Sequence, residues 1–299
     1  MKRKVVQIGG FTKVISLPRQ WVKKQKIEKG DELEIQERGD SLLIRCDDEK
    51  SKIASIDLRN TDRFLKRYIE TYYRRGYDIL YVKVPNEYFI SLIQKGVSSR
   101  LLGFEIVEQK EHQVTIKSIS DGIEQEFKVI LRRIFLMLNT MAKEGHQPMK
   151  TGNYDKLLNL IELEEINNKF TNFCQRALNK QGHENHHNTN TLYNIVTQLE
   201  QIADAYAQIF KILNENPKRK LKPSTMKMYS MTESLLQKFH ILFYNFKVER
   251  LLDFDKLQKE IIQKKDVWFG SSKNYVENYV CAQLFLVTKQ LHHLTECLF

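Results

Sequence analysis

The sequence contains no long hydrophobic run. Of its 299 residues, 41% are hydrophobic and 28% are charged, as in an ordinary globular protein. No window approaches the roughly 20 apolar residues that a membrane helix needs, and the basic N-terminus lacks the apolar core of a secretory signal peptide. We therefore expect a cytoplasmic protein without membrane insertion, long enough for two or three domains.

Cysteine is scarce, and catalytic motifs are missing. The four cysteines, Cys46, Cys174, Cys281 and Cys297, lie far apart and never in CxxC spacing, so we expect reduced thiols, most of them buried. Neither a GxGxxG nor a Walker loop is present, and no Ser, His and Asp set can be picked out. We expect no enzyme and no catalytic residues.

Aspartate and glutamate are absent from the first 27 residues. The chain has 48 Lys and Arg against 37 Asp and Glu, a formal charge of +11. Eight of the bases and none of the acids lie in residues 1–27, so this segment carries +8 and the rest of the chain only +3. Such placement is typical of a dedicated polyanion-binding module. A basic surface that serves solubility alone is the alternative.

Hydrophobic periodicity divides the chain into three regions, which predicts a multidomain protein. Residues 1–50 alternate as short strands separated by glycine turns, with one short helix after Pro18. Residues 51–119 alternate strands with two helices and end in a hairpin, which predicts a small α/β connector domain. Residues 120–299 have helical periodicity throughout, which predicts an all-α six-helix bundle.

Six apolar segments define the expected helices of this bundle. They lie near residues 127–141, 157–177, 192–213, 224–247, 251–267 and 272–298. Glycine and proline are expected to mark joints between helices at Gly145, Gly182, Pro217 and Gly270. Two sets of three helices indicate a duplicated three-helix unit.

The N-terminal strands are too short and too few to enclose a core alone, so we expect two chains to combine there as a homodimer. The short helix carries Arg19, Lys23 and Lys24 within about a turn and a half, next to a glycine turn with Lys13. Two copies of this arrangement would form a basic surface that contacts the phosphates of double-stranded DNA.

A carboxylate pair is the main candidate site of the helical region. Glu200 and Asp204 lie one helical turn apart in LEQIADAYAQIF, and the preceding helix contains Glu164. Acidic pairs on two helices can bind a hard or transition cation, here iron, manganese or zinc. The alternative is a solvated acidic face without a metal ion.

The segment HENHH, residues 183–187, matches the zinc-protease pattern HExxH through His183, Glu184 and His187. That pattern needs a helix, which places both imidazoles on one face. The flanking NKQG and NTNT are polar and form turns, so we expect a solvated loop, with adventitious metal binding favoured over catalysis.

Residues 3–47 resemble the SpoVT/AbrB family of DNA-binding domains. The resemblance rests on Gly10, Ser16, Leu17, Pro18, Trp21, Ile27, Gly30, Asp31 and Ile35. It implies a swapped-hairpin β-barrel dimer that contacts DNA through Arg3, Lys4, Lys13, Arg19, Lys23 and Lys24. Lysines stand where many members have arginines, and this implies more contact with phosphate than with bases.

Residues 121–298 resemble the PhoU family, and the order of the regions resembles archaeal PhoU-type phosphate uptake regulators. LEQIADAYAQIF is similar to that family's LERIADxxxxIA, and EEINNKFTNFCQRAL to its DxxVDRLxFLxxR helix, with Arg176 at the arginine. The resemblance implies paired acids that hold metal clusters. Here Asn168 replaces one acid and the last helix has no acidic pair, so we expect weaker metal binding.

Two functions are compatible with these patterns. The first is a dimeric DNA-binding transcriptional regulator of phosphate uptake, whose bundle senses a state or binds a partner. The second is a signalling adaptor that acts on the ATPase of a phosphate transporter or on a sensor protein, with the barrel used mainly to dimerise.

Overall fold

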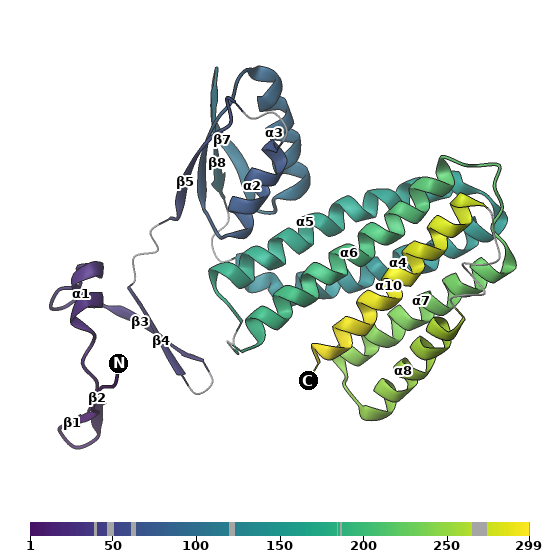
Figure 1. Cartoon of the computed structure of the whole chain (residues 1–299). Helices are drawn as coiled ribbons and strands as arrows, with labels where there is room; N and C mark the ends of the chain where they lie inside the picture. The colour runs from purple at the N-terminus through teal and green to yellow at the C-terminus, as the bar shows by residue number, and fades with distance from the viewer. Residues whose placement is uncertain are drawn as a thin grey trace. The chain divides into compact units, whose positions relative to one another are not determined.

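The chain divides into two compact units (Figure 1). The first is formed by Met1–Ser51, and the second by Lys52–His183 together with His187–Phe299. This computed structural model describes residues 1–38, 41–46, 51–60, 64–119, 123–183, 185, 187–264 and 274–298. Each unit is considered by itself below.

The N-terminal unit consists of two antiparallel hairpins and one short helix. Strands β1 (Val6–Ile8) and β2 (Thr12–Val14) form the first hairpin, and β3 (Leu33–Arg38) and β4 (Ser41–Cys46) form the second. Helix α1 (Arg19–Gln25) lies between them in sequence, after Pro18. The elements agree with the strand and helix pattern predicted for residues 1–50.

No described side chain of this unit is buried. Large apolar side chains are at least half exposed on both hairpins; they include Val6, Ile8, Phe11, Ile35 and Leu42. The two sheets of the described chain do not pair with each other, so a single chain has no closed barrel. The swapped-hairpin barrel stays a prediction that requires a second copy.

The second unit begins with a four-stranded sheet in the order β5-β6-β8-β7. Its strands are β5 (Ile53–Asp57), β6 (Ile79–Lys83), β7 (Phe104–Lys110) and β8 (Gln113–Ser118). The parallel pair β5-β6 is joined through helix α2 (Leu65–Arg74), because parallel strands need a crossover. Helix α3 (Glu87–Arg100) connects β6 to the predicted hairpin β7-β8.

One face of this sheet is packed under α2 and α3. Alternate residues of the central strands point into this core, and Leu80, Val82, Val114 and Ile116 are fully buried. Helix α3 begins at an Asn86 cap whose side chain accepts a hydrogen bond from the N–H of Tyr88 at 3.1 Å. The mixed α/β pattern expected for residues 51–119 is therefore present.

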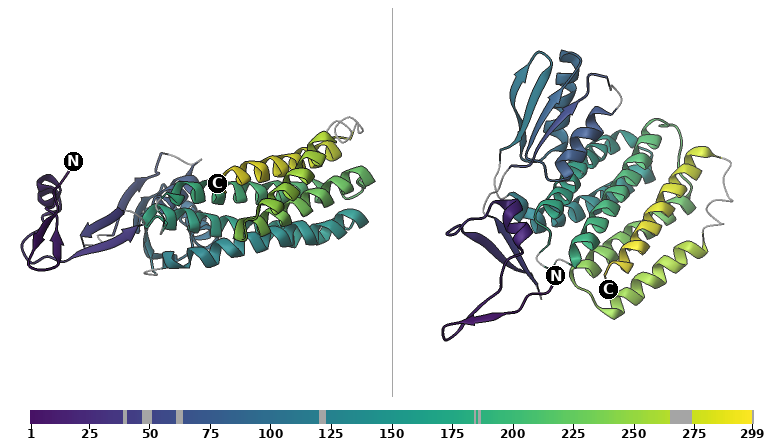
Figure 2. Two further views of the ribbon diagram at one scale, coloured as in Figure 1. Left: turned by 90° about the horizontal axis from the view of Figure 1, so that it is seen from below. Right: turned by 60° about the vertical axis from the view of Figure 1, so that its left-hand side comes forward.

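The rest of the second unit is helical, and Figure 2 shows its helices side by side in both views. The helices are α4 (Phe127–Thr151), α5 (Leu158–Lys180), α6 (Asn188–Asn214), α7 (Pro223–Tyr244), α8 (Val248–Gln263) and α10 (Tyr275–Glu296). Short 3-10 turns, Ile123–Glu126 and Tyr154–Leu157, precede α4 and α5. Each predicted helical segment corresponds to one of these helices, and all contribute to one apolar core.

The predicted joint at Gly145 is wrong, because this glycine lies inside α4. A Cβ built on Gly145 would lie 2.6 Å from the Tyr229 hydroxyl and 2.7 Å from ring atoms of Phe210. The glycine is thus required by close packing of α4 against α6 and α7. Gly182 and Pro217 do lie between helices, whereas Gly270 lies outside the described residues.

The described helices include none with the length and apolarity of a membrane span. The cysteines are all free: Cys174 and Cys281 are buried, and Cys46 and Cys297 are half-buried. Burial raises the pKa of the Cys174 thiol far above its ordinary value.

Candidate nucleic-acid interface

The six basic residues predicted to contact DNA are all exposed. Arg3 and Lys4 precede β1, Lys13 lies on β2, and Arg19, Lys23 and Lys24 lie on α1. None of their side chains forms an ion pair or a hydrogen bond with a described residue. Their charges are therefore available to an external anion.

Helix α1 carries two bases on one face. Arg19 and Lys23 are separated by four residues, which places them on the same face. The first turn contains no acid, and Lys23 and Lys24 occupy the last turn, where cations interact favourably with the helix dipole. A concavity of about 590 Å³ lies beside this helix, lined in part by Arg19, Val22 and Lys23.

The end of α1 and the following turn explain where the acidic residues begin. Lys26 adopts a left-handed conformation with φ 55°, and its N–H lies 3.4 Å from the carbonyl oxygen of Lys23. The Asp31 carboxylate accepts a hydrogen bond from the N–H of Glu28 at 2.7 Å, and Gly30 has φ 103°. The first acids thus stabilise a turn, which needs Gly and Asp at these positions.

The predicted carboxylate site is also brought together in the second unit. Glu164 on α5 is buried, and it interacts with Asp204 on α6, one turn from Glu200. Asn168 donates its side-chain N–H to Glu164, and the Lys211 ammonium lies 3.9 Å from the other Glu164 oxygen. This cluster therefore contains carboxylates together with an amide donor and a cation that offset the negative charge of Glu164.

Burial is the main cause of the perturbed acidity in this cluster. It raises the pKa of Glu200 to about 7, with a further contribution from the negative charge of Asp204. Burial and the charge of Glu164 also raise the pKa of Asp204, whereas Arg100 and Lys211 act in the opposite direction.

These carboxylates do not fit a multinuclear metal site as they are arranged. Within the described ranges, no three His, Cys, Asp or Glu side chains are grouped so that they can hold a metal ion. The groups beside Glu164 are the Asn168 amide and the Lys211 ammonium, which are hydrogen-bond donors and not the anionic ligands that a hard cation needs. Iron, manganese or zinc at Glu164, Glu200 and Asp204 stays a prediction, which elemental analysis of untagged protein tests.

The HENHH segment lies in the link between α5 and α6. His183 and His187 are not helical, and the N–H of His183 donates to the Thr189 hydroxyl at 3.0 Å. Glu184 lies outside the described residues. Because the HExxH pattern requires one continuous helix, the described part of this segment does not have the geometry of a zinc-protease site.

Two features of the second unit were not found from the sequence. One is a buried ion pair between Arg176 and Asp78, and the other is a cleft between α2 and α3. Both combine residues that lie far apart in the chain. A glycine within a helical pattern, Gly96, is a sequence signal that could have indicated the cleft.

Comparison with known proteins gave a family match for the N-terminal unit only. Residues 6–50 match the sequence pattern of a family described as antidote-toxin recognition MazE, bacterial antitoxin. The curated proteins and the solved structures gave no match to the chain, and these comparisons support neither the PhoU resemblance nor an archaeal origin. Residues 6–50 are therefore a MazE/AbrB-like domain, of the DNA-binding class to which the SpoVT/AbrB resemblance also pointed.

Proposed function

We propose that this protein is a dimeric DNA-binding transcriptional regulator. The observation that carries the proposal is a MazE/AbrB-like domain in which the six basic side chains predicted to contact DNA are exposed and make no ion pairs with described residues. Lysines and arginines on β2 and α1 contact phosphates, and α1 is short enough to address a groove. Lysine at most of these positions favours a strong hold on phosphate with modest base selectivity.

Dimerisation is supported by the apolar surface of the same unit. Ile8, Ile35 and Leu42 are each more than half exposed in one chain. Contiguous exposed apolar surface on a small unit typically marks a protein interface. Pairing two copies would bury this surface and place two α1 helices in one assembly, so that half-site spacing contributes to specificity.

Fluorescence anisotropy of a labelled duplex, measured at increasing salt concentration, tests the proposal. The affinity is expected to fall roughly 10³-fold or more between about 50 and 200 mM salt if six or more phosphates are neutralised. Absence of duplex binding at low ionic strength would refute DNA binding.

A more specific part of this proposal is that the protein regulates phosphate uptake. Its support is the similarity of LEQIADAYAQIF and EEINNKFTNFCQRAL to PhoU motifs. Mapping the protein along its own genome tests it, because occupancy beside phosphate-transport genes is expected. Binding to a phosphate-transporter ATPase without genomic occupancy would instead favour the signalling adaptor.

A further inference from the structure

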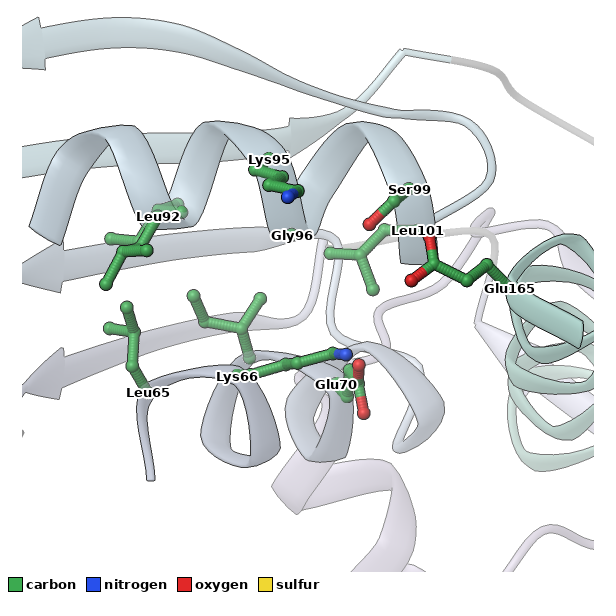
Figure 3. Close-up of a pocket in the computed structure, with 11 residues that line it drawn as sticks. Leu65, Lys66, Glu70, Leu92, Lys95, Gly96, Ser99, Leu101 and Glu165 are labelled. Atoms are coloured by element: carbon green, nitrogen blue, oxygen red, sulfur yellow. The ribbon is translucent and has the colours of Figure 1, made fainter. Parts of the chain in front are cut away.

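A cleft of about 380 Å³ lies between α2 and α3 in the second unit (Figure 3). Its floor is apolar, because Ile69, Ile93 and Leu101 are buried beneath it. The volume is within the range of about 300–1,000 Å³ that is usual for small-molecule sites. The cleft is thus large enough for a small metabolite.

Gly96 on α3 keeps the cleft open. A Cβ built on this residue would meet no atom within 4 Å, and the residue has no positive φ. Glycine within a helix costs about 1 kcal/mol relative to alanine, and neither backbone conformation nor close packing requires it here. Gly145, by contrast, is explained by its contacts. What Gly96 provides is space in the cleft.

Four charged side chains surround this space without partners among the described residues. Lys66 and Glu70 come from α2, Lys95 from α3 and Glu165 from α5. None of them makes an ion pair or a side-chain hydrogen bond with a described residue. One carboxylate oxygen of Glu70, Oε1, is buried and has no hydrogen-bond partner in the described part of the chain. A buried acceptor without a donor is costly, so it favours a ligand that supplies one.

The charges and apolar groups are arranged in order along the cleft. Figure 3 shows the carboxylates of Glu70 and Glu165 toward α5, with Leu65 and Leu92 at the opposite end. The ammonium group of Lys95 lies between these ends, and that of Lys66 is drawn beside the Glu70 carboxylate. An occupant that matches this order carries a cation, an anion and an apolar group.

We propose that the cleft binds a free α-amino acid with an apolar side chain. Its ammonium group donates to Glu70 and Glu165, and its carboxylate accepts from Lys66 and Lys95. Its side chain packs among the leucines and isoleucines of the cleft. A simple anion would meet the two glutamates, and a purely apolar ligand would leave the buried Oε1 atom of Glu70 without a donor, so neither complements the site. This proposal goes beyond DNA binding and does not depend on it.

Isothermal titration of the full chain with L-leucine, L-isoleucine, L-methionine and L-phenylalanine tests the proposal. At least one is expected to bind, whereas 4-methylpentanoate, which lacks the ammonium group, and 3-methylbutylamine, which lacks the carboxylate, bind at least about tenfold more weakly. Failure of all four amino acids at millimolar concentration would overturn the proposal. An analogue that binds as tightly as the amino acids would also overturn the proposal.

Variants locate the binding site. Glu165→Gln and Lys95→Gln are each expected to weaken binding by about tenfold to a hundredfold, as for the loss of a charge-assisted hydrogen bond. Glu105→Gln, which removes an exposed carboxylate on β7, leaves the affinity unchanged. Unchanged binding in both cleft variants would contradict the assignment.

Gly96→Leu separates binding from folding. A Cβ at this position meets no atom within 4 Å and a larger side chain extends toward the cleft, so the melting temperature is expected to stay the same or to rise while amino-acid binding is abolished. A Gly96→Leu variant that melts like the wild type and still binds with wild-type affinity would overturn the proposal.

Discussion

At the scale of single residues, Arg176 is the most constrained charged side chain described. It is 1% exposed. Its guanidinium donates to Asp78 at 2.5 Å and to the carbonyl oxygens of Tyr73 and Tyr77 at 3.1 and 2.6 Å. It also lies over the rings of Tyr73 and Phe104. Arg176 therefore joins α5 to the α/β region through α2 and the start of β6.

Replacing Arg176 should destabilise the second unit strongly. Arg176→Met removes this donor from Asp78 and from two carbonyl groups. Asp78 keeps the Lys180 ammonium at 2.9 Å, so the cost is expected to come mainly from the carbonyl groups, at about 1–3 kcal/mol for each group left without a donor. Arg59→Gln is the matched control, because Arg59 pairs with Asp57 at an exposed position and should change stability by less than about 1 kcal/mol. Urea denaturation measures the free energy of unfolding of both variants. Equal losses in the two variants would contradict a structural role for Arg176.

His240 should make stability depend on pH. Burial lowers the pKa of its imidazole, and the positive charge of Arg132 adds to the effect. The Asn139 amide donates to Nδ1 of His240 at 2.9 Å, so protonation at Nδ1 would break this bond. The unfolded chain then binds the proton at higher pH than the folded chain, and stability is lost as the pH falls below about 6.5.

The wild type should therefore lose more free energy of unfolding between about pH 8 and pH 5.5 than the variant His240→Gln. Urea denaturation at both pH values measures this difference. An equal loss in both proteins would show that another group is responsible.

At the scale of elements, two glycines in helices should behave oppositely. Gly145→Ala places a methyl group against Phe210 and Tyr229, whose hydroxyl is held by the carbonyl of Ala142 at 2.7 Å, so it should cost about 1–3 kcal/mol. Gly96→Ala meets open space and should stabilise the chain by up to about 1 kcal/mol. Thermal unfolding measures both, and stabilisation by Gly145→Ala would contradict close packing at this position.

Elements with strong periodicity could be predicted from the sequence, whereas contacts between them could not. The alternation in β5 and β6 and the apolar period of α4 to α6 specify these elements locally. Gly145 was misplaced because the same residue type serves helix ends and close helix contacts. The pair Arg176–Asp78 joins residues 98 positions apart, and the cleft at Gly96 combines residues from Leu65 to Glu165, so both depend on tertiary contacts. The basic residues of the candidate interface lie close together in the sequence, so their exposure could be anticipated from it, whereas their contact with DNA stays a prediction.

At the scale of the whole molecule, the N-terminal unit should determine the oligomeric state. Ile35→Glu puts a charge on a β3 surface that two chains are expected to bury, and it should shift the dimer toward monomer in analytical ultracentrifugation. Leu252→Glu on α8 is the matched control, because Leu252 is equally exposed, at 62%. Dissociation by Leu252→Glu alone would place the interface in the second unit instead.

The most direct test of the central claim is the salt dependence of duplex binding after charge removal from α1. Arg19→Gln with Lys23→Gln should reduce the slope of log affinity against log salt by about 0.9 for each phosphate that the variant no longer neutralises. The control, Lys218→Gln with Lys220→Gln, removes the same charge from the link between α6 and α7 and should leave the slope unchanged. Equal slopes for the wild type and the α1 variant would contradict DNA binding through α1.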